Sequence, residues 1–306
     1  MKKIRIVYVG VAMLLLLPLV AGAQVFMNDT FTDGGRTDGA DALDVAWYTT
    51  SGGTPSVANN ATIGSGNALT FTPRTVDINN ASPKYQQRIV GQFGSTATLT
   101  NAGDWIKLSF NIVVDSNNNN QTATNRTLRF GLFNSNLTSF AADAYDVNRS
   151  GNAGNDTGYM AALSVDPNTR GDLNYEQAGT DTTFMGGATA PLTVLRNDAL
   201  GFLSENTAYT MSLLITRLTS AADSNVSVEY TLGGVSKLLN SSYGTATSRL
   251  FSFDEVGFAG GVANNTGGYL VYSLDNVVVE TIPEPATMSI LAMGTLLLTR
   301  FQRRRK

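Results

Sequence analysis

The chain carries no histidine and no cysteine, so its chemistry must depend on carboxyl, amide, hydroxyl and aromatic side chains. This composition removes the usual general base, the ordinary ligands of catalytic zinc, any cysteine nucleophile and any disulfide. Cleavage of a glycosidic bond would need two carboxyl groups on either side of that bond. No glutamate of residues 24–282 has an acidic neighbour two positions away, and the adjacent Asp254 and Glu255 must point to opposite sides of a strand. The sequence therefore predicts a protein that is not an enzyme.

Two acidic positions near the ends of the central region are candidates for a structural calcium site. Asp29 lies shortly after position 23, and Asp275 lies in the last apolar segment of this region. Carboxylate and amide oxygens are the natural ligands of calcium, and the two positions would approach each other if the first and last strands pair. The alternative is that these acidic residues only form turns and mark the ends of strands.

Four aromatic residues are candidates for stacking on sugar rings. A sugar-binding surface needs exposed aromatic rings together with polar side chains on loops or strand ends. The alternative is that each ring fills the core, which is the interpretation favoured for Trp105 because it begins an alternating strand. The four candidates are Trp47, Tyr48, Tyr145 and Tyr243.

Short apolar segments separated by Gly, Asn, Ser, Thr and Asp recur along residues 24–282, with almost no sustained helical period. Val226, Val228 and Tyr230 alternate with polar residues, as in a strand with one buried face. The Gly-Gly pair at 233–234 indicates a hairpin. The predicted strands are 68–72, 88–93, 96–100, 105–114, 127–133, 159–165, 209–218, 226–232, 249–258 and 269–280.

These strands predict an all-β fold. A single open sheet would expose its apolar side to water, so two antiparallel sheets packed face to face are expected. The expected architecture is an antiparallel β-sandwich of the jelly-roll type. A helical segment should flank it at each end of the chain.

The N-terminal segment has the three parts of a signal peptide. A cationic start, Met-Lys-Lys-Ile-Arg, precedes an apolar run at 6–20 and the small residues Ala21 and Ala23. Signal peptidase accepts small residues at these two positions, and the run is short for a permanent membrane helix. Residues 1–23 are therefore predicted to be a signal peptide cleaved after Ala23.

The C-terminal segment also has three parts. Pro283, Glu284 and Pro285 precede an apolar stretch at 286–299 and a basic end. As a helix the stretch would be about 21 Å long, against a hydrocarbon core of about 30 Å, so flanking residues or bilayer thinning must complete a span. The basic end should hold the helix on the cytoplasmic side. Its cationic residues are Arg300, Arg303, Arg304, Arg305 and Lys306.

This order of motif, apolar span and basic end closely resembles the PEP-CTERM sorting signal, which is handled by the membrane enzyme exosortase. The resemblance covers residues 283–306 only. It implies transit across the inner membrane, transient anchoring there by the C-terminal helix, recognition near Pro283-Glu284-Pro285, and delivery to the cell surface or an extracellular matrix. The alternative is a plain membrane anchor with an incidental Pro-Glu-Pro.

The central region, 24–282, resembles the concanavalin A-like (laminin-G-like) jelly-roll domains that often accompany such tails. The resemblance is carried by strand 209–218, the hairpin at 226–232 and the segment Ser-Leu-Asp-Asn-Val-Val-Val at 273–279. It implies carbohydrate binding, sometimes with calcium. Glucanases of this fold use a Glu-x-Asp-x-Glu strand, and the sequence has none.

Removal of both ends makes the chain strongly acidic. Eight of the 21 basic residues lie in the ends but only one of the 24 acidic residues does, which leaves 13 against 23 and a balance of −10. A nucleic-acid partner would need a basic face, so none is expected.

The expected function is that of an exported, non-catalytic surface or matrix protein associated with polysaccharide. Signal peptidase and exosortase are its expected processing partners, and the inner membrane holds it before processing. The main alternative is a structural or adhesive coat protein without a ligand site. A glycan hydrolase is the less favoured third interpretation.

Overall fold

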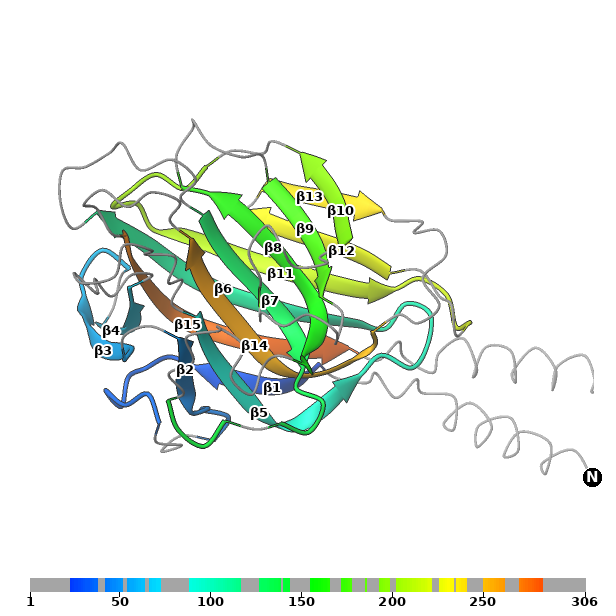
Figure 1. Cartoon of the computed structure of the whole chain (residues 1–306), viewed down its shortest axis with the longest axis horizontal. Helices are drawn as coiled ribbons and strands as arrows, with labels where there is room; N and C mark the ends of the chain where they lie inside the picture. Colours follow the sequence, from blue (N-terminus) through cyan, green and yellow to red (C-terminus); the bar gives the residue numbers. More distant parts are fainter. Residues whose placement is uncertain are drawn as a thin grey trace, which may run out of the picture.

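The chain folds into two packed antiparallel sheets (Figure 1). All the strand pairs within both sheets are antiparallel, which confirms the predicted all-β sandwich. The computed structural model describes residues 23–37, 42–51, 54–63, 66–72, 88–116, 127–138, 140–143, 155–165, 172–177, 185, 193–198, 202–221, 226–233, 235–240, 250–261 and 270–282.

Sheet A contains the first and last strands of the sandwich. Its order is β13-β12-β11-β6-β15-β4-β3, and β1 also pairs with β15. The bounds are β1 Gln24–Asp29, β3 Ser56–Asn60, β4 Gly66–Phe71, β6 Trp105–Ser116, β11 Tyr209–Arg217, β12 Val226–Leu232, β13 Val235–Asn240 and β15 Leu270–Ile282.

Sheet B lies across sheet A, so that the two overlap in the view of Figure 1. Its order is β10-β9-β8-β7-β14-β5-β2. The bounds are β2 Trp47–Ser51, β5 Arg88–Thr98, β7 Thr127–Asn134, β8 Thr157–Ser164, β9 Asp172–Gln177, β10 Thr193–Asp198 and β14 Ser252–Gly261.

Alternation along the strands puts one apolar face of each sheet into a shared core. On β6, Leu108, Phe110 and Ile112 are buried, whereas the residues between them are only partly buried. Phe110 packs edge-on against Phe130 of β7 and Phe258 of β14, with ring centroids 5.1 and 4.9 Å apart. These contacts join the two sheets, as expected for a strand with one apolar face.

Strand β15 is the most extensively paired element of sheet A. It runs along β6 from Leu270 to Ile282, with a bulge after Asp275. On its other side it pairs first with β4 and then with β1, where Gln24 lies opposite Thr281. The first and last strands of the sandwich are therefore neighbours.

The predicted strands agree with the observed ones where apolar residues alternate, and the hairpin at 233–234 is confirmed because Leu232 pairs with Val235. The predicted strands 88–93 and 96–100 prove to be one continuous strand, β5. The signal segment, the sorting motif and the basic end lie outside the described residues. Among the residues with an assigned position, no helix is long and apolar enough to cross a membrane.

Glycines allow close packing at the outer face of sheet B. A Cβ placed on Gly158 would lie 2.1 Å from the Leu132 carbonyl oxygen and 2.6 Å from Phe133 Cδ1. A Cβ on Gly94 would meet nothing within 4 Å. The backbone of β8 therefore approaches β7 at a distance that only glycine permits at position 158.

Gly158→Ala should destabilise the sandwich by about 2–3 kcal/mol, because the new methyl group must displace backbone as well as the Phe133 ring. Urea unfolding at fixed pH measures the change. Gly94→Ala is the matched control, and it should change stability by less than about 0.5 kcal/mol. Equal effects of the two substitutions would contradict the close packing at Gly158.

Candidate functional site

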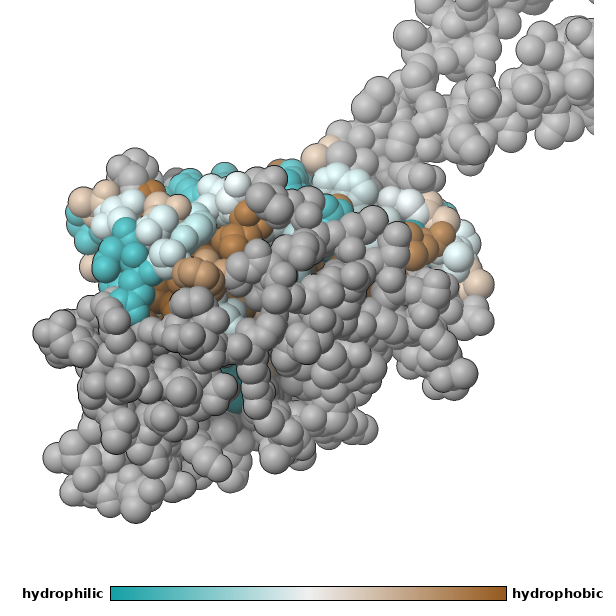
Figure 2. Space-filling view, turned by 90° about the horizontal axis from the view of Figure 1, so that it is seen from above, coloured by the Kyte–Doolittle hydropathy of each residue, from teal (hydrophilic) through white to brown (hydrophobic). Residues whose placement is uncertain are grey.

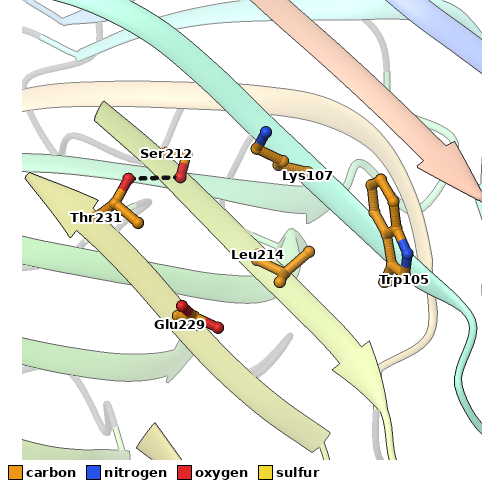
Figure 3. A pocket seen from close by; sticks show the side chains of 6 residues that line it. All are labelled: Trp105, Lys107, Ser212, Leu214, Glu229 and Thr231. Carbon is orange, nitrogen blue, oxygen red and sulfur yellow. Dashed lines mark hydrogen bonds between the residues drawn. The ribbon is translucent and has the colours of Figure 1, made fainter. Parts of the chain in front are cut away.

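The described part of the sandwich has an open groove on the outer face of sheet A, with a volume of about 500 Å³ (Figure 3). It is formed by the neighbouring strands β6, β11 and β12. We call it the Trp105 groove. Its lining residues are Trp105, Lys107, Ser212, Leu214, Glu229 and Thr231.

Strand register explains why these six side chains meet. Lys107, Leu214 and Glu229 are opposite one another on adjacent strands and form one row across the sheet. Ser212 and Thr231 form the next row. Since successive side chains of a strand alternate between faces, the residues between these rows point into the core and the rows themselves point to solvent.

The groove combines one aromatic ring with hydroxyl and charged groups. The hydroxyl groups of Ser212 and Thr231 are 2.7 Å apart and hydrogen-bonded to each other. Lys107 Nζ lies 3.7 Å from Glu280 Oε1, and the two side chains are 36% and 28% exposed. A shallow surface of this kind can stack a sugar ring on an indole and bond its hydroxyls, as sugar-binding sites require.

The carboxylates around the groove are poorly placed for hydrolysis. Glu280 and Glu229 lie on β15 and β12, which are separated by β6 and β11 in the sheet. Three strand spacings of about 4.8 Å put their backbones about 14 Å apart. Glycosidases need carboxyl groups about 5–9.5 Å apart, so this pair does not form a glycosidase site.

Trp105 corrects the sequence interpretation that placed it in the core. It lines the groove and is only partly buried, whereas Trp47 is fully buried. The Trp47 indole donates from Nε1 to Asp29 Oδ2 at 2.8 Å and packs against Phe258. Its ring is therefore not available to a sugar.

The other aromatic candidates have different outcomes. Tyr48 is half-buried and packs against an apolar cluster on the outer face of sheet B, away from the Trp105 groove. Tyr145 and Tyr243 lie outside the described residues. The structure thus brings none of the four predicted aromatic residues into the groove.

The two predicted calcium ligands do not form one site. Asp29 points into the core, where burial raises its pKa to about 6 despite hydrogen bonds from Trp47 and from the Phe31 backbone. Asp275 points to the other face of sheet A, and its two oxygens accept bonds from the backbone and side chain of Asn276. Within the described ranges, no group of three or more acidic side chains is placed to hold a metal ion.

A buried carboxyl pair was missed by the sequence reasoning. Glu255 of β14 lies near Asp156, which precedes β8, and both side chains are fully buried. Burial raises the pKa of Asp156 to about 7 and that of Glu255 well above its usual range. The signal available in the sequence was an acid inside the apolar run of strand β14. Because both side chains are fully buried, a sugar cannot reach the space between the two groups.

Polar and apolar groups are mixed on the outside of the sandwich. On the described part of the face in Figure 2, hydrophilic and hydrophobic residues lie side by side. Fold and groove together define the class: an antiparallel β-sandwich with a shallow, mixed polar and aromatic groove on one sheet.

No protein-family model matches the chain, and no curated protein matches it. Among solved structures, a basic winged bean lectin with Tn-antigen has a TM-score of 0.46 at 8% identity, covering 85% of this chain and 98% of that one. The carbohydrate recognition domain of Emp47p has a TM-score of 0.44 at 9% identity, covering 84% and 95%. A Bacteroides ovatus GH16 protein in complex with a G4G4G3G product has a TM-score of 0.42 at 12% identity, covering 74% and 85%. With TM-scores below 0.5, these likenesses transfer no residue and no activity to this chain.

The two tryptophans should differ in their accessibility to quenchers. The chain has two tryptophans, of which Trp47 is fully buried and Trp105 lines an open groove. Trp105→Phe should therefore remove most of the acrylamide-quenchable, red-shifted emission and leave a blue-shifted, protected component. Steady-state fluorescence quenching measures this. Unchanged quenching in the variant would show that Trp105 is not accessible.

Proposed function

We propose that the chain is an exported, non-catalytic surface or extracellular-matrix protein whose β-sandwich binds polysaccharide in the Trp105 groove. Signal peptidase and exosortase are its processing partners in this proposal. The C-terminal segment holds it in the inner membrane before it reaches the cell exterior. In this proposal the protein has a concanavalin A-like sandwich, binds no nucleic acid and catalyses no reaction.

The observation that carries the binding proposal is the arrangement of the groove itself. Trp105 supplies an apolar ring at one end of the groove, and Ser212 and Thr231 supply hydroxyl groups at the other end. Three hydrogen-bonded strands hold these side chains in register, with the row of Lys107, Leu214 and Glu229 between the two ends. The groove is open rather than closed, so it can accept the middle of a long chain as well as its end. Weak binding at one such site becomes strong when many copies share a surface.

Export is supported by the sequence at both ends. The described sandwich begins with β1 at Gln24 and ends with β15 at Ile282. Loss of residues 1–23 and 283–306 would therefore remove no described strand. Transit, sorting and the final location remain parts of the proposal that rest on the resemblance to PEP-CTERM tails.

A structural coat protein without a ligand is the second candidate function. The observation that favours it is the large cluster of buried apolar residues between the sheets, which would make a stable spacer without any binding. A glycan hydrolase is disfavoured because Glu229 and Glu280 are too far apart and Asp156 and Glu255 are buried.

Trp105→Ala should weaken retention of the producer's own exopolysaccharide by the immobilised full-length chain. Loss of one stacking ring costs about 1 kcal/mol, or about fivefold per site, and the effect multiplies on a dense surface. Trp105→Phe should restore part of the retention, since a ring remains. Surface plasmon resonance at two immobilisation densities measures both variants.

Tyr48→Ala is the control for this experiment, because Tyr48 lies on the other sheet. It should bind as the parent chain does. No retention at any density would favour the coat protein. Release of oligosaccharide during the incubation would show an enzyme.

Protein recovered from the producing cells' surface should lack the basic C-terminal end. If the tail is processed near Pro283-Glu284-Pro285, no tryptic or Glu-C peptide should contain residues from Arg303 to Lys306. Mass spectrometry of the native protein tests this, with the unprocessed cytoplasmic pool as the positive control. An intact C-terminus on surface protein would contradict exosortase processing.

A further inference from the structure

The charged side chains of the Trp105 groove belong to one row across sheet A. Glu229 of β12, Leu214 of β11 and Lys107 of β6 are opposite one another. Glu280 of β15 continues the row on the other side of Lys107, and its Oε1 lies 3.7 Å from Lys107 Nζ. The row therefore holds two carboxylates and one ammonium group, and the ammonium group has one of the carboxylates beside it.

The other basic residue on the strands of the groove directs its charge elsewhere. Strands β6, β11 and β12 contain two basic residues, Lys107 and Arg217. The Arg217 guanidinium donates to the carbonyl oxygens of Leu99 and Thr219 at 2.8 and 2.9 Å. It also lies 4.3 Å from the centroid of the Phe251 ring. Lys107 is therefore the basic side chain that a ligand in the groove would meet.

The groove is longer than one sugar ring. Trp105 lies at one end, and Thr231 lies at the other end, two strands and four residue positions away (Figure 3). With about 4.8 Å between strands and about 3.3 Å per residue, their backbones are about 16 Å apart. A polysaccharide that stacks on Trp105 and reaches the Thr231 hydroxyl must therefore pass between Lys107 and Glu229. Any charge on its middle rings then lies beside the charged row.

We propose that the Trp105 groove selects polysaccharide that carries amino groups and rejects polysaccharide that carries carboxylate groups. This selection rests on the proposed function, since it assigns a class of ligand to the same groove. A protonated amino group on a middle ring can donate to the Glu229 carboxylate, and hydrogen bonds between charged partners are about twice as strong as neutral ones.

A carboxylate in the same position would be repelled. It would lie near Glu229, and the cation within its reach, Lys107, already has Glu280 beside it. The balance of 13 basic against 23 acidic residues over 24–282 acts in the same direction at longer range, because it attracts cationic chains and repels anionic ones.

Binding of three oligosaccharides to the full-length chain measures the selection. Oligomers of glucosamine, glucose and mannuronic acid that share one β linkage and one length differ mainly in charge. At pH 6 and low salt, the glucosamine oligomer should bind about fivefold more tightly than the glucose oligomer, and the mannuronic acid oligomer about fivefold more weakly. Both differences should fall below about twofold in 1 M salt, where the Debye length is about 3 Å. Isothermal titration calorimetry measures all three affinities.

Two substitutions of Glu229 supply the second arm. Glu229→Gln keeps the size of the side chain and removes its charge, so the ratio of glucosamine affinity to glucose affinity should fall to less than about twofold. Glu229→Lys should reverse the order, so that the mannuronic acid oligomer binds more tightly than the glucosamine oligomer.

Asp33→Asn is the matched control, because it removes one negative charge away from the groove. Asp33 is exposed and follows β1, which lies on the far side of β15 from β6. Its Oδ1 accepts the Gly35 N–H at 3.1 Å, a bond that the asparagine oxygen can keep. The glucosamine preference of this variant should stay at about fivefold.

The outcomes separate this selection from the proposed function. Equal affinities for the three oligomers, or a glucosamine preference that survives Glu229→Gln, overturn the selection and leave polysaccharide binding in place. A preference that Asp33→Asn also abolishes overturns the assignment to the groove, because net charge alone would then select the ligand. If the chain binds none of the three oligomers and retains no exopolysaccharide, the selection and the proposed function fail together.

Discussion

The packing of Phe110 edge-on against Phe130 and Phe258 is the contact on which the rest of the architecture depends. Phe110 belongs to sheet A and its two partners to sheet B, so this cluster joins the layers. Edge-to-face aromatic contacts add about 0.5–1.5 kcal/mol to the burial of the rings themselves. With no cysteine in the chain, apolar packing of this kind has to replace disulfide bridges. These contacts hold the sheets together through their inner faces, so the outer faces can carry rows of polar side chains. The Trp105 groove is formed by such rows.

Alternation of apolar and polar residues made the core strands predictable, and its absence explains the strands that were not predicted. Val226, Val228 and Tyr230 have a clear period of two, and β12 is where the pattern placed it. Strands β3, with the sequence SVANN, and β1 were not predicted, because pairing with β4 and β15 stabilises them and their own sequence does not. Single-sequence patterns carry little information about such long-range pairing.

The candidate site was less predictable than the fold. Trp47 and Trp105 are both strand-terminal aromatics in the sequence, and only the register of the sheets decides that one faces the core and the other the solvent. The Trp105 groove unites residues from three strands spread over more than a hundred positions. Asp156 and Glu255 are almost as far apart in sequence. Their proximity follows from the pairing of β7 with both β8 and β14, which no spacing rule in the sequence predicts.

The central position of β15 has a mechanical consequence. This strand is bonded to β6 on one side over nearly its whole length, and to β4 and β1 on the other. A pull applied at Ile282 along the strand would load the hydrogen bonds on both sides of β15 in shear, so that many of them must break together. A pull between Gln24 and Ile282 would instead separate β1 from β15 one hydrogen bond at a time, because Gln24 lies opposite Thr281. The sandwich therefore resists tension transmitted along its last strand far better than tension that separates its two ends.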